Sequence, residues 1–307
     1  MKLSIVATLY KSEAYVYEFC ERVNKVTSQI TDDYEVILVN DGSPDDSLGC
    51  ALNIQEKNSH VVIVDLSRNY GHHKAMMTGL MHATGDYVFL IDSDLEERPE
   101  WLDTFFDEME KCVCDVVYGV QEKRKGNIFE KITGIIFWKI INMLSGMSLP
   151  ENITTARLMT RRYVNALLQH EEREVFIAGL WHITGYEQRP VNVKKESRSK
   201  STYTLRKKIS LLVNSITSFS NAPLVLIFYT GLFISVFSGA YNLYLAVNWL
   251  FWSKPPDGWT SVMASIWLLG GLVIFFIGVI GIYLSKVFSE TKRRPYTIVR
   301  QVYEKKL

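Results

Sequence analysis

The sequence predicts a doubly wound α/β domain with a mostly parallel sheet, followed by two apolar helices long enough to cross a membrane. Over residues 2–120, short Val- and Ile-rich runs alternate with helical patterns. Such near-continuous apolar strands are typical of a parallel sheet that helices cover on both faces. Two long apolar stretches without any charge, 223–252 and 261–285, follow near the C-terminus.

The elements of the first 120 residues follow from these patterns in order. The expected strands are "LSIVATL" (3–9), "YEVILVN" (34–40), "HVVIVDL" (60–66), "DYVFLI" (86–91) and "CDVVYGV" (114–120), and the expected helices are 13–29, 44–57, 72–84 and 99–111. Ser43 and Pro44 suit the N-cap and first position of the second helix. Residues 128–149 form either a core helix or a helix on the bilayer surface.

Charge and cysteine content exclude several classes of protein. Lys and Arg total 34 against 33 Asp and Glu, a net charge of +1, which does not favour nucleic acid as the main partner. The apolar run at the N-terminus is too short for a signal peptide, so this part should stay in the cytoplasm. The four cysteines lack zinc-ligand spacing, and we expect them to be reduced thiols.

The apolar stretches exceed the length that a bilayer of about 30 Å requires. Basic residues precede the first stretch and follow the second: Arg206, Lys207, Lys208, Lys286, Lys292, Arg293 and Arg294. The positive-inside rule then predicts a two-helix hairpin in the inner membrane with both termini cytoplasmic. We expect a cytoplasmic domain (1–205), an amphipathic segment (206–222), the two spans (223–287) and a basic tail (288–307). The glycines of the spans leave homo-oligomerisation through these helices open.

Acidic residues directly follow one expected strand, in the stretch "YVFLIDSDLEERPE" (87–100). Ligands of doubly wound sheets bind at the carboxyl ends of the strands. Asp92 and Asp94 would repel each other there unless a cation joined them. Carboxylate oxygens suit Mg²⁺ or Mn²⁺, which often hold a diphosphate. The pair therefore predicts a metal and diphosphate site.

Five segments resemble family 2 glycosyltransferases of the polyprenyl-phosphate type, which have the GT-A fold. They are "EVILVNDGSPDDS" (35–47), "LSRNYGHHKAMMTGLMHATGDYVFLIDSDLEERPE" (66–100), "RLMTRR" (157–162), "KSTYTLRKKI" (200–209) and "ETKRRPYTIVRQVY" (290–303). The resemblance covers nearly the whole chain. It implies a GT-A, Rossmann-like catalytic domain followed by a transmembrane hairpin.

The resemblance also implies roles for single residues. Ala7, Leu9, Tyr10, Glu13, Asp41, Arg68 and Gly71 would bind the nucleotide; Asp92 and Asp94 would be catalytic and, with Glu96, hold the metal; Arg124, Lys131, Arg198 and Ser201 would bind the lipid phosphate. The family pattern has Pro where Ala7 stands and Gln where Glu96 stands. Many relatives carry an Asp shortly before the "RLM" motif, where this chain offers only Asn152 or Thr155. His72, His73 and His82 are expected to be surface or packing residues.

The implied reaction transfers one sugar from a nucleotide sugar, UDP-glucose or a related UDP-sugar, to undecaprenyl or another polyprenyl phosphate. The implied partners are therefore the nucleotide sugar, the lipid phosphate and membrane lipids. A synthase using GDP-mannose and dolichol phosphate is the alternative. A non-catalytic, membrane-anchored sugar-nucleotide-binding module is a third interpretation, which the presence of both Asp92 and Asp94 disfavours. A processive polysaccharide synthase would require a Gln-x-x-Arg-Trp motif, which this sequence lacks.

Overall fold

The computed structural model describes residues 1–121, 152–172, 177–195, 217, 220, 222–251 and 258–305. The chain forms two compact units. The first comprises Met1–Trp138, Ser148–Thr204 and Arg294–Leu307, and the second comprises Lys139–Met147 and Leu205–Arg293. The helix expected over 128–149 lies outside the described residues, as does most of the expected amphipathic segment.

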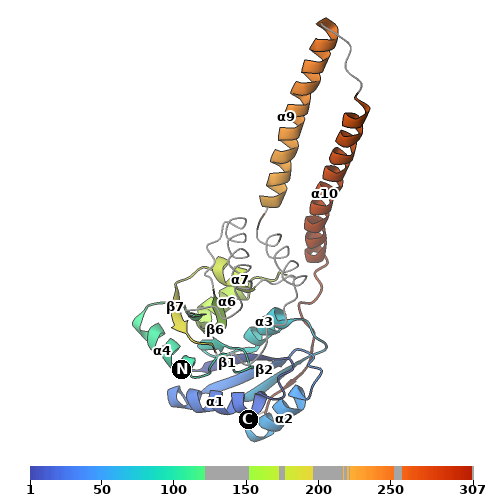
Figure 1. Ribbon diagram of the computed structural model, residues 1–307. Helices are drawn as coiled ribbons and strands as arrows, with labels where there is room; N and C mark the ends of the chain where they lie inside the picture. The colour runs from blue at the N-terminus through green and yellow to red at the C-terminus, as the bar shows by residue number, and fades with distance from the viewer. Residues whose placement is uncertain are drawn as a thin grey trace. The chain divides into compact units, whose positions relative to one another are not determined.

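An eight-stranded sheet forms the centre of the first unit (Figure 1). Its strands are β1 (Leu3–Leu9), β2 (Tyr34–Asn40), β3 (Val61–Leu66), β4 (Tyr87–Leu90), β5 (Val116–Gln121), β6 (Ile153–Thr160), β7 (Gln188–Val193) and β8 (Val299–Tyr303). Their order is β7-β5-β6-β4-β1-β2-β3-β8. Only β6 and β8 run against the others, so the expected mostly parallel, doubly wound sheet is confirmed.

Helices cover both faces of this sheet (Figure 1). In the first unit they are α1 (Val16–Ile30), α2 (Ser47–Lys57), α3 (His72–His82), α4 (Trp101–Lys111), α6 (Arg161–Leu167) and α7 (Ile177–Ile183). Leu3, Ile5 and Leu9 of β1 are fully buried in the core that α1, α2 and α4 cover. On the opposite face, α3 lies so close to β1 that a Cβ on Gly79 would stand 2.5 Å from Val6 Cγ1.

The strand order creates a switch point between β1 and β4. From β1 the chain winds outward through β2 and β3, whereas β4 lies on the other side of β1. In doubly wound sheets, ligands bind outside the carboxyl ends of the strands at such a point. Lys11 and Leu95, which follow these two strand ends, both have positive φ, near 57° and 58°. Such conformations cost energy in residues other than glycine and often accompany functional sites.

The C-terminal segment completes the sheet of the first unit. β8 pairs antiparallel with β3, with Val302 opposite Val64. The Thr297 hydroxyl lies 2.8 Å from that of Thr78 on α3, and Arg300 contacts the buried Asp65 of β3 at 3.2 Å. Residues 288–307, expected to be a basic tail, therefore contribute an edge strand to the sheet of the first unit.

The second helix also differs from the expected one. It begins at Ser47 with Asp46 as N-cap, not at Pro44. Ser43 instead accepts a hydrogen bond from the Lys11 amide at 2.7 Å and donates one to Asp45 at 2.5 Å. Its hydroxyl therefore joins the loops after β1 and β2 and does not cap the helix.

The second unit contains two long apolar helices, α9 (Ala222–Phe251) and α10 (Trp259–Thr291). Large apolar side chains such as Phe233 and Ile274 are exposed along them. Within the described residues, one helix, Leu268–Thr291, is long and apolar enough to cross a membrane, with a mean hydropathy of 2.4. This supports membrane association of the chain.

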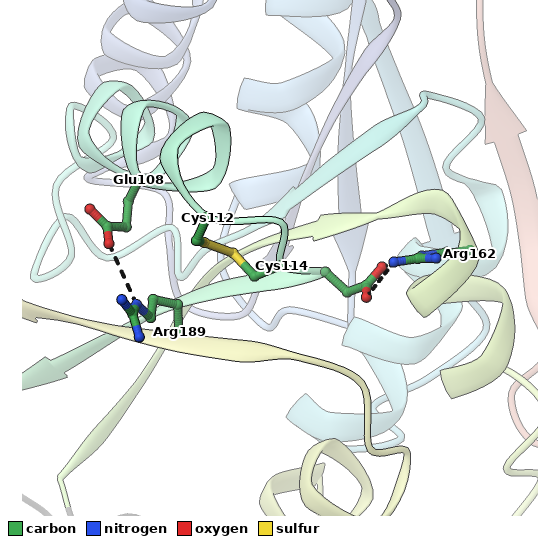
Figure 2. The surroundings of a disulfide bond; sticks show 6 residues. Glu108, Cys112, Cys114, Arg162 and Arg189 are labelled. Atoms are coloured by element: carbon green, nitrogen blue, oxygen red, sulfur yellow. Dashed lines mark hydrogen bonds and ion pairs between the residues drawn. A yellow bond between two sulfur atoms is a disulfide. The ribbon is translucent and has the colours of Figure 1, made fainter.

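A disulfide joins Cys112 and Cys114 in the turn between α4 and β5 (Figure 2). The expectation that all four cysteines are reduced thiols is therefore wrong for this pair, although Cys20 and Cys50 are free. The neighbouring Asp115 pairs with Arg162 (Figure 2). The disulfide precedes the amino end of β5, so it lies at the edge of the sheet opposite to the ligand-binding edge.

Candidate active site

A group of acidic side chains lies at the carboxyl end of β4. Asp92 and Asp94 belong to the turn that follows this strand, and Leu95 in its positive-φ conformation reverses the chain. Asp94 accepts a hydrogen bond from the Glu96 amide at 2.9 Å. Burial raises the pKa of Asp94, and the charge of Asp92 raises it further. The expected repulsion between the two carboxylates is therefore present.

His72, the first residue of α3, contacts this acidic group. Its Nε2 lies 3.1 Å from Asp92 Oδ1, and its Nδ1 lies 3.0 Å from the Thr8 hydroxyl at the end of β1. Burial opposes protonation of His72, but the hydrogen bond and charge of Asp92 outweigh it, so the pKa of His72 is raised. Burial likewise opposes ionisation of Asp92, yet His72 holds the pKa of Asp92 below its ordinary value. The His72 side chain is 47 % exposed, which agrees with the expected surface position, and it additionally contacts Asp92.

Glu97 is the most buried member of the group, with 0 % of its surface exposed. One of its carboxylate oxygens accepts a hydrogen bond from the Thr155 amide at 3.0 Å. Its other oxygen, Oε2, has no hydrogen-bond partner among the described residues. Burial and the charge of Asp92 raise the pKa of Glu97 to about 7, against the opposing charge of Lys195. Thr155, one of the two positions considered for the missing Asp, thus lies beside this carboxyl group.

Lys195 supplies a positive charge to the same place. It follows β7, and its Nζ lies 3.4 Å from Glu96 Oε2 and 3.6 Å from Glu97 Oε1. Burial would lower the pKa of Lys195, but the surrounding carboxylates outweigh it and raise the pKa. Glu96, expected to be a metal ligand, is paired with this lysine here. A cavity of about 230 Å³ adjoins the group and is lined by Glu97, Gln121, Asn152, Ile153, Thr154, Thr155 and Lys195.

The residues present fit a divalent cation that is shared with a substrate. No group of three or more His, Cys, Asp or Glu side chains in the described part of the chain is placed to hold a metal ion by itself. Mg²⁺ rarely needs such a group, because one or two carboxylates with substrate phosphates and water complete its coordination. The Oε2 atom of Glu97 is buried beside this pair and has no hydrogen-bond partner among the described residues, so a further polar ligand can be accommodated there. Asp92 and Asp94 are therefore suited to a metal–diphosphate complex.

The residues expected to bind the nucleotide near the end of β1 differ in how far they are exposed. Ala7 and Leu9 are fully buried in the core, so their side chains pack under the strand end. Tyr10, directly after β1, is 48 % exposed, and Lys11 Nζ lies 5.8 Å from the centre of its ring. Glu13 accepts a hydrogen bond from the Asp46 amide at 3.1 Å and thereby joins the loops after β1 and β2.

Asp41 organises the loop that follows β3. Its two carboxylate oxygens accept hydrogen bonds from the amides of Tyr70, at 2.7 Å, and Gly71, at 3.0 Å. Gly42 permits this approach, because a Cβ there would lie 2.5 Å from the Asn69 amide nitrogen. The Arg68 guanidinium stacks on the ring of Tyr70. Asp41 thus positions Arg68 and Gly71 at the ligand-binding edge of the sheet.

A larger cavity, of about 660 Å³, lies beside this loop. It is lined by Asn40, Gly42, Ser43, Asp45, Asp46, Leu48, Gly49, Leu52, Asp65, Arg68, Asn69 and Arg300. Arg300 comes from β8, so the C-terminal segment contributes to this wall. The size suits a nucleoside, since small-molecule sites are commonly about 300–1,000 Å³.

The four residues expected to bind the lipid phosphate, Arg124, Lys131, Arg198 and Ser201, lie outside the described residues. Sequence reasoning did not assign Glu97 or Lys195 to the site. The position of Lys195 directly after a parallel strand was the available signal, because all parallel strand ends of this sheet meet at the same edge.

Comparison with known proteins identifies the family. The family model described as glycosyl transferase family 2 matches residues 4–168, which is more than half of the chain. The chain belongs to glycosyl transferase family 2. One relative, from Mycobacterium tuberculosis (strain CDC 1551 / Oshkosh), is named as a glycosyltransferase. It is 50 % identical to this chain, over 99 % of this chain and 89 % of its own length. The bactoprenol glucosyl transferase of Shigella phage SfV is 28 % identical, over 99 % of this chain and all of its own.

Among solved structures, the glucosyl-3-phosphoglycerate synthase of Mycobacterium tuberculosis in complex with Mn²⁺ and UDP is 17 % identical, with a TM-score of 0.49. The alignment covers 71 % of this chain and 80 % of the synthase. The sheet of this chain is mostly parallel, with the acidic group at its switch point. Its match to the family model over residues 4–168 makes the chain a glycosyltransferase.

The raised pKa of Glu97 predicts a pH effect on stability without metal. Between about pH 4.5 and 7, unfolded Glu97 loses its proton while the buried side chain retains it. Stability contributed by this residue is thus expected to fall as the pH rises through this range. Thermal unfolding in EDTA should show this fall for the wild type and for Glu110→Gln, a surface control, but a smaller one for Glu97→Gln. Identical dependence of the unfolding temperature on pH for all three proteins would contradict this role of Glu97.

Proposed function

We propose that this glycosyltransferase transfers a single sugar from a nucleotide sugar to a polyprenyl phosphate at the cytoplasmic face of the inner membrane. UDP-glucose or a related UDP-sugar is the donor. The observation that carries the proposal is the half-buried carboxylate pair Asp92 and Asp94 at the switch point of the mostly parallel sheet. Such a pair needs a cation, and the cation in turn suits a diphosphate.

The donor would be held at the carboxyl ends of β1, β2 and β4. Asp92 and Asp94 would hold Mg²⁺ or Mn²⁺, which stabilises the negative charge that develops on the departing nucleoside diphosphate. His72 keeps Asp92 in place through its 3.1 Å contact. Exposed Tyr10 is available to the base, and the loop that Asp41 organises brings Arg68 toward the nucleotide.

The names of the relatives and the apolar helices support a lipid acceptor. The relatives named bactoprenol glucosyl transferases align with this chain over nearly their whole length. The exposed apolar side chains of α9 and α10 would contact the acyl chains of the membrane. Arg124, Lys131, Arg198 and Ser201 remain the residues proposed to receive the acceptor phosphate.

The acceptor phosphate explains why a dedicated base is unnecessary. Transfer to an alcohol needs a group that takes the hydroxyl proton. A phosphate monoester has a second pKa of about 6, so at neutral pH it already carries an unprotonated oxygen. Thr155 is, with Asn152, one of the two residues that could align with the Asp of many relatives, and its amide donates a hydrogen bond to Glu97. The enzyme then needs only to orient the phosphate oxygen for an inverting displacement of the nucleoside diphosphate.

The pairing of β8 with β3 supports the proposal of two membrane spans. This pairing requires the segments before α9 and after α10 to be in the same compartment as the sheet. The number of membrane crossings between them is therefore even. If Leu268–Thr291 crosses the membrane, α9 must cross it too. The basic residues at both ends of this hairpin support a cytoplasmic location for that compartment.

Cysteine labelling of intact cells tests this topology. A membrane-impermeant maleimide should modify Gly258→Cys, in the loop between the helices, and should leave Lys305→Cys unmodified until the cells are opened. Wild-type protein with its native cysteines is the background control. Labelling of Lys305→Cys but not of Gly258→Cys in intact cells would overturn the topology.

Incubation of the purified protein with polyprenyl phosphate, Mn²⁺ and a panel of nucleotide sugars tests the donor. A lipid-linked sugar formed from a UDP-sugar is the expected product. Formation only from GDP-mannose would favour the dolichol-phosphate-mannose type of synthase. Nucleotide-sugar binding without transfer or metal-dependent hydrolysis would instead indicate a binding module.

A further inference from the structure

A third cavity, of about 360 Å³, is lined by residues outside the acidic group. Residues of β5, β6, α7 and the turn before β7 surround it. Among them are Tyr118, Arg157, Trp181, His182, Glu187 and Gln188. None of them belongs to the expected nucleotide, metal or lipid-phosphate residues.

Two hydrogen-bond donors on the wall of this cavity have no partner. Arg157 is only 1 % exposed and Trp181 only 5 %. Arg157 Nη1 and the indole Nε1 of Trp181 are both buried without a hydrogen-bond partner in the described part of the chain. The Gln188 amide is already occupied, since it donates to the carbonyl groups of Trp181 and Gly185. The cavity therefore offers unused donors.

The charge of Arg157 is also poorly compensated. Its guanidinium stacks on the Trp181 ring, and its Nε lies 3.4 Å from the Thr155 carbonyl oxygen. No carboxylate among the described residues forms an ion pair with it. Burial lowers the pKa of Arg157 to about 9, which nearby tyrosines and Glu97 only partly offset. A buried cation without a counterion is costly, and so is each unpaired donor.

We propose that this cavity is an oxyanion-binding site in which Arg157 and Trp181 hold a phosphate group. A planar guanidinium is suited to a phosphate or carboxylate, and an indole N–H can only donate. The carboxylate of Glu187, which also lines the cavity, belongs to an exposed residue, where water screens its repulsion.

The phosphate group that this cavity would bind belongs to one of two classes of molecule. Ile153 lines both this cavity and the smaller one beside Glu97 and Lys195. A phosphate here is therefore either a soluble phosphate compound or the headgroup of the lipid acceptor, and only the second version rests on the proposed function. Binding of soluble phosphate does not require glycosyl transfer.

The test is calorimetric titration of inorganic phosphate into the full-length protein in detergent with EDTA. We expect saturable binding to the wild type and to Trp101→Phe, a matched control whose indole packs elsewhere against the core. Trp181→Phe removes one donor but keeps the aromatic ring, and should weaken binding about tenfold. Arg157→Gln should abolish it. No saturable binding to the wild type, or equal affinity of wild type and Trp181→Phe, would overturn the site.

A folding control and a competition experiment complete the test. Circular dichroism checks that each variant is folded, and Trp181→Phe decides the outcome if Arg157→Gln is not. Phosphate binding should persist in Asp94→Asn. The oxyanion site can therefore be confirmed even if the proposed transfer reaction is not observed. Displacement of phosphate by a short-chain polyprenyl phosphate would identify the site as one for the lipid headgroup, and lack of displacement as one for a soluble phosphate.

Discussion

Replacing Asp94 by Asn is expected to lower turnover about 1,000-fold while leaving the fold intact. The amide keeps the size of the side chain and can still accept the hydrogen bond from the Glu96 amide. It removes one of the two carboxylate charges proposed to hold the metal. Metal stabilisation of the transition state is worth several kcal/mol, and about 4 kcal/mol corresponds to this loss of rate.

The variant should also require more metal. Initial rates at increasing Mn²⁺ should show a higher half-saturating metal concentration for Asp94→Asn. Without metal, the midpoint temperature of unfolding of this variant should be no lower than that of the wild type. Burial and the charge of Asp92 already raise the pKa of Asp94, so the charged carboxylate is unfavourable there. Asp103→Asn, on the surface of α4, is a control for loss of negative charge. Turnover of Asp94→Asn near that of the wild type without added metal would refute the role of this residue.

Removing residues 296–307 is expected to destabilise the catalytic unit strongly. The truncation deletes β8 and exposes the edge of β3, whose residues Ile63 and Val64 are fully buried. It also removes Arg300 from the buried Asp65 and Thr297 from Thr78. Loss of a few kcal/mol from these contacts corresponds to a midpoint of thermal unfolding lowered by about 10 °C.

A shorter truncation is the matched control. Removing only residues 304–307 leaves all of β8 and should change the midpoint little. The exposed β3 edge should also promote association of the longer truncation, detectable by size-exclusion chromatography. An unchanged midpoint and unchanged activity after removal of residues 296–307 would show that β8 does not support the catalytic unit.

The first four strands could be predicted from the sequence because each is a nearly uninterrupted apolar run. β1, for instance, is buried at all seven positions, so its composition alone identifies it. β8 was not predicted, because three of its five residues are exposed and its apolar pattern is weak. Its place beside β3 arises from pairing across 235 positions of sequence, as between Asp65 and Arg300, which local patterns do not encode.

Some residues of the candidate site could likewise be predicted from the sequence, and others could not. Asp92 and Asp94 could be identified because two acids directly follow a buried strand, which is costly without a cation. His72 is exposed, as expected, but its contact with Asp92 could not be predicted, because only the fold brings the start of α3 beside the end of β4. Glu97, Lys195 and Arg157 depend on the path of the turn around Leu95 and on the pairing of β5, β6 and β7. Only tertiary structure brings these residues together.

Comparison of two acceptors tests the central claim most directly. Purified protein with Mn²⁺ and its UDP-sugar donor is given either polyprenyl phosphate or the corresponding polyprenol, and the initial rates of lipid glycosylation are measured. The phosphate supplies its own unprotonated oxygen, and this chain offers only Asn152 or Thr155 where the family resemblance implies an Asp. We therefore expect transfer to polyprenyl phosphate and almost none to polyprenol. Glycosylation of polyprenol as fast as polyprenyl phosphate would contradict it.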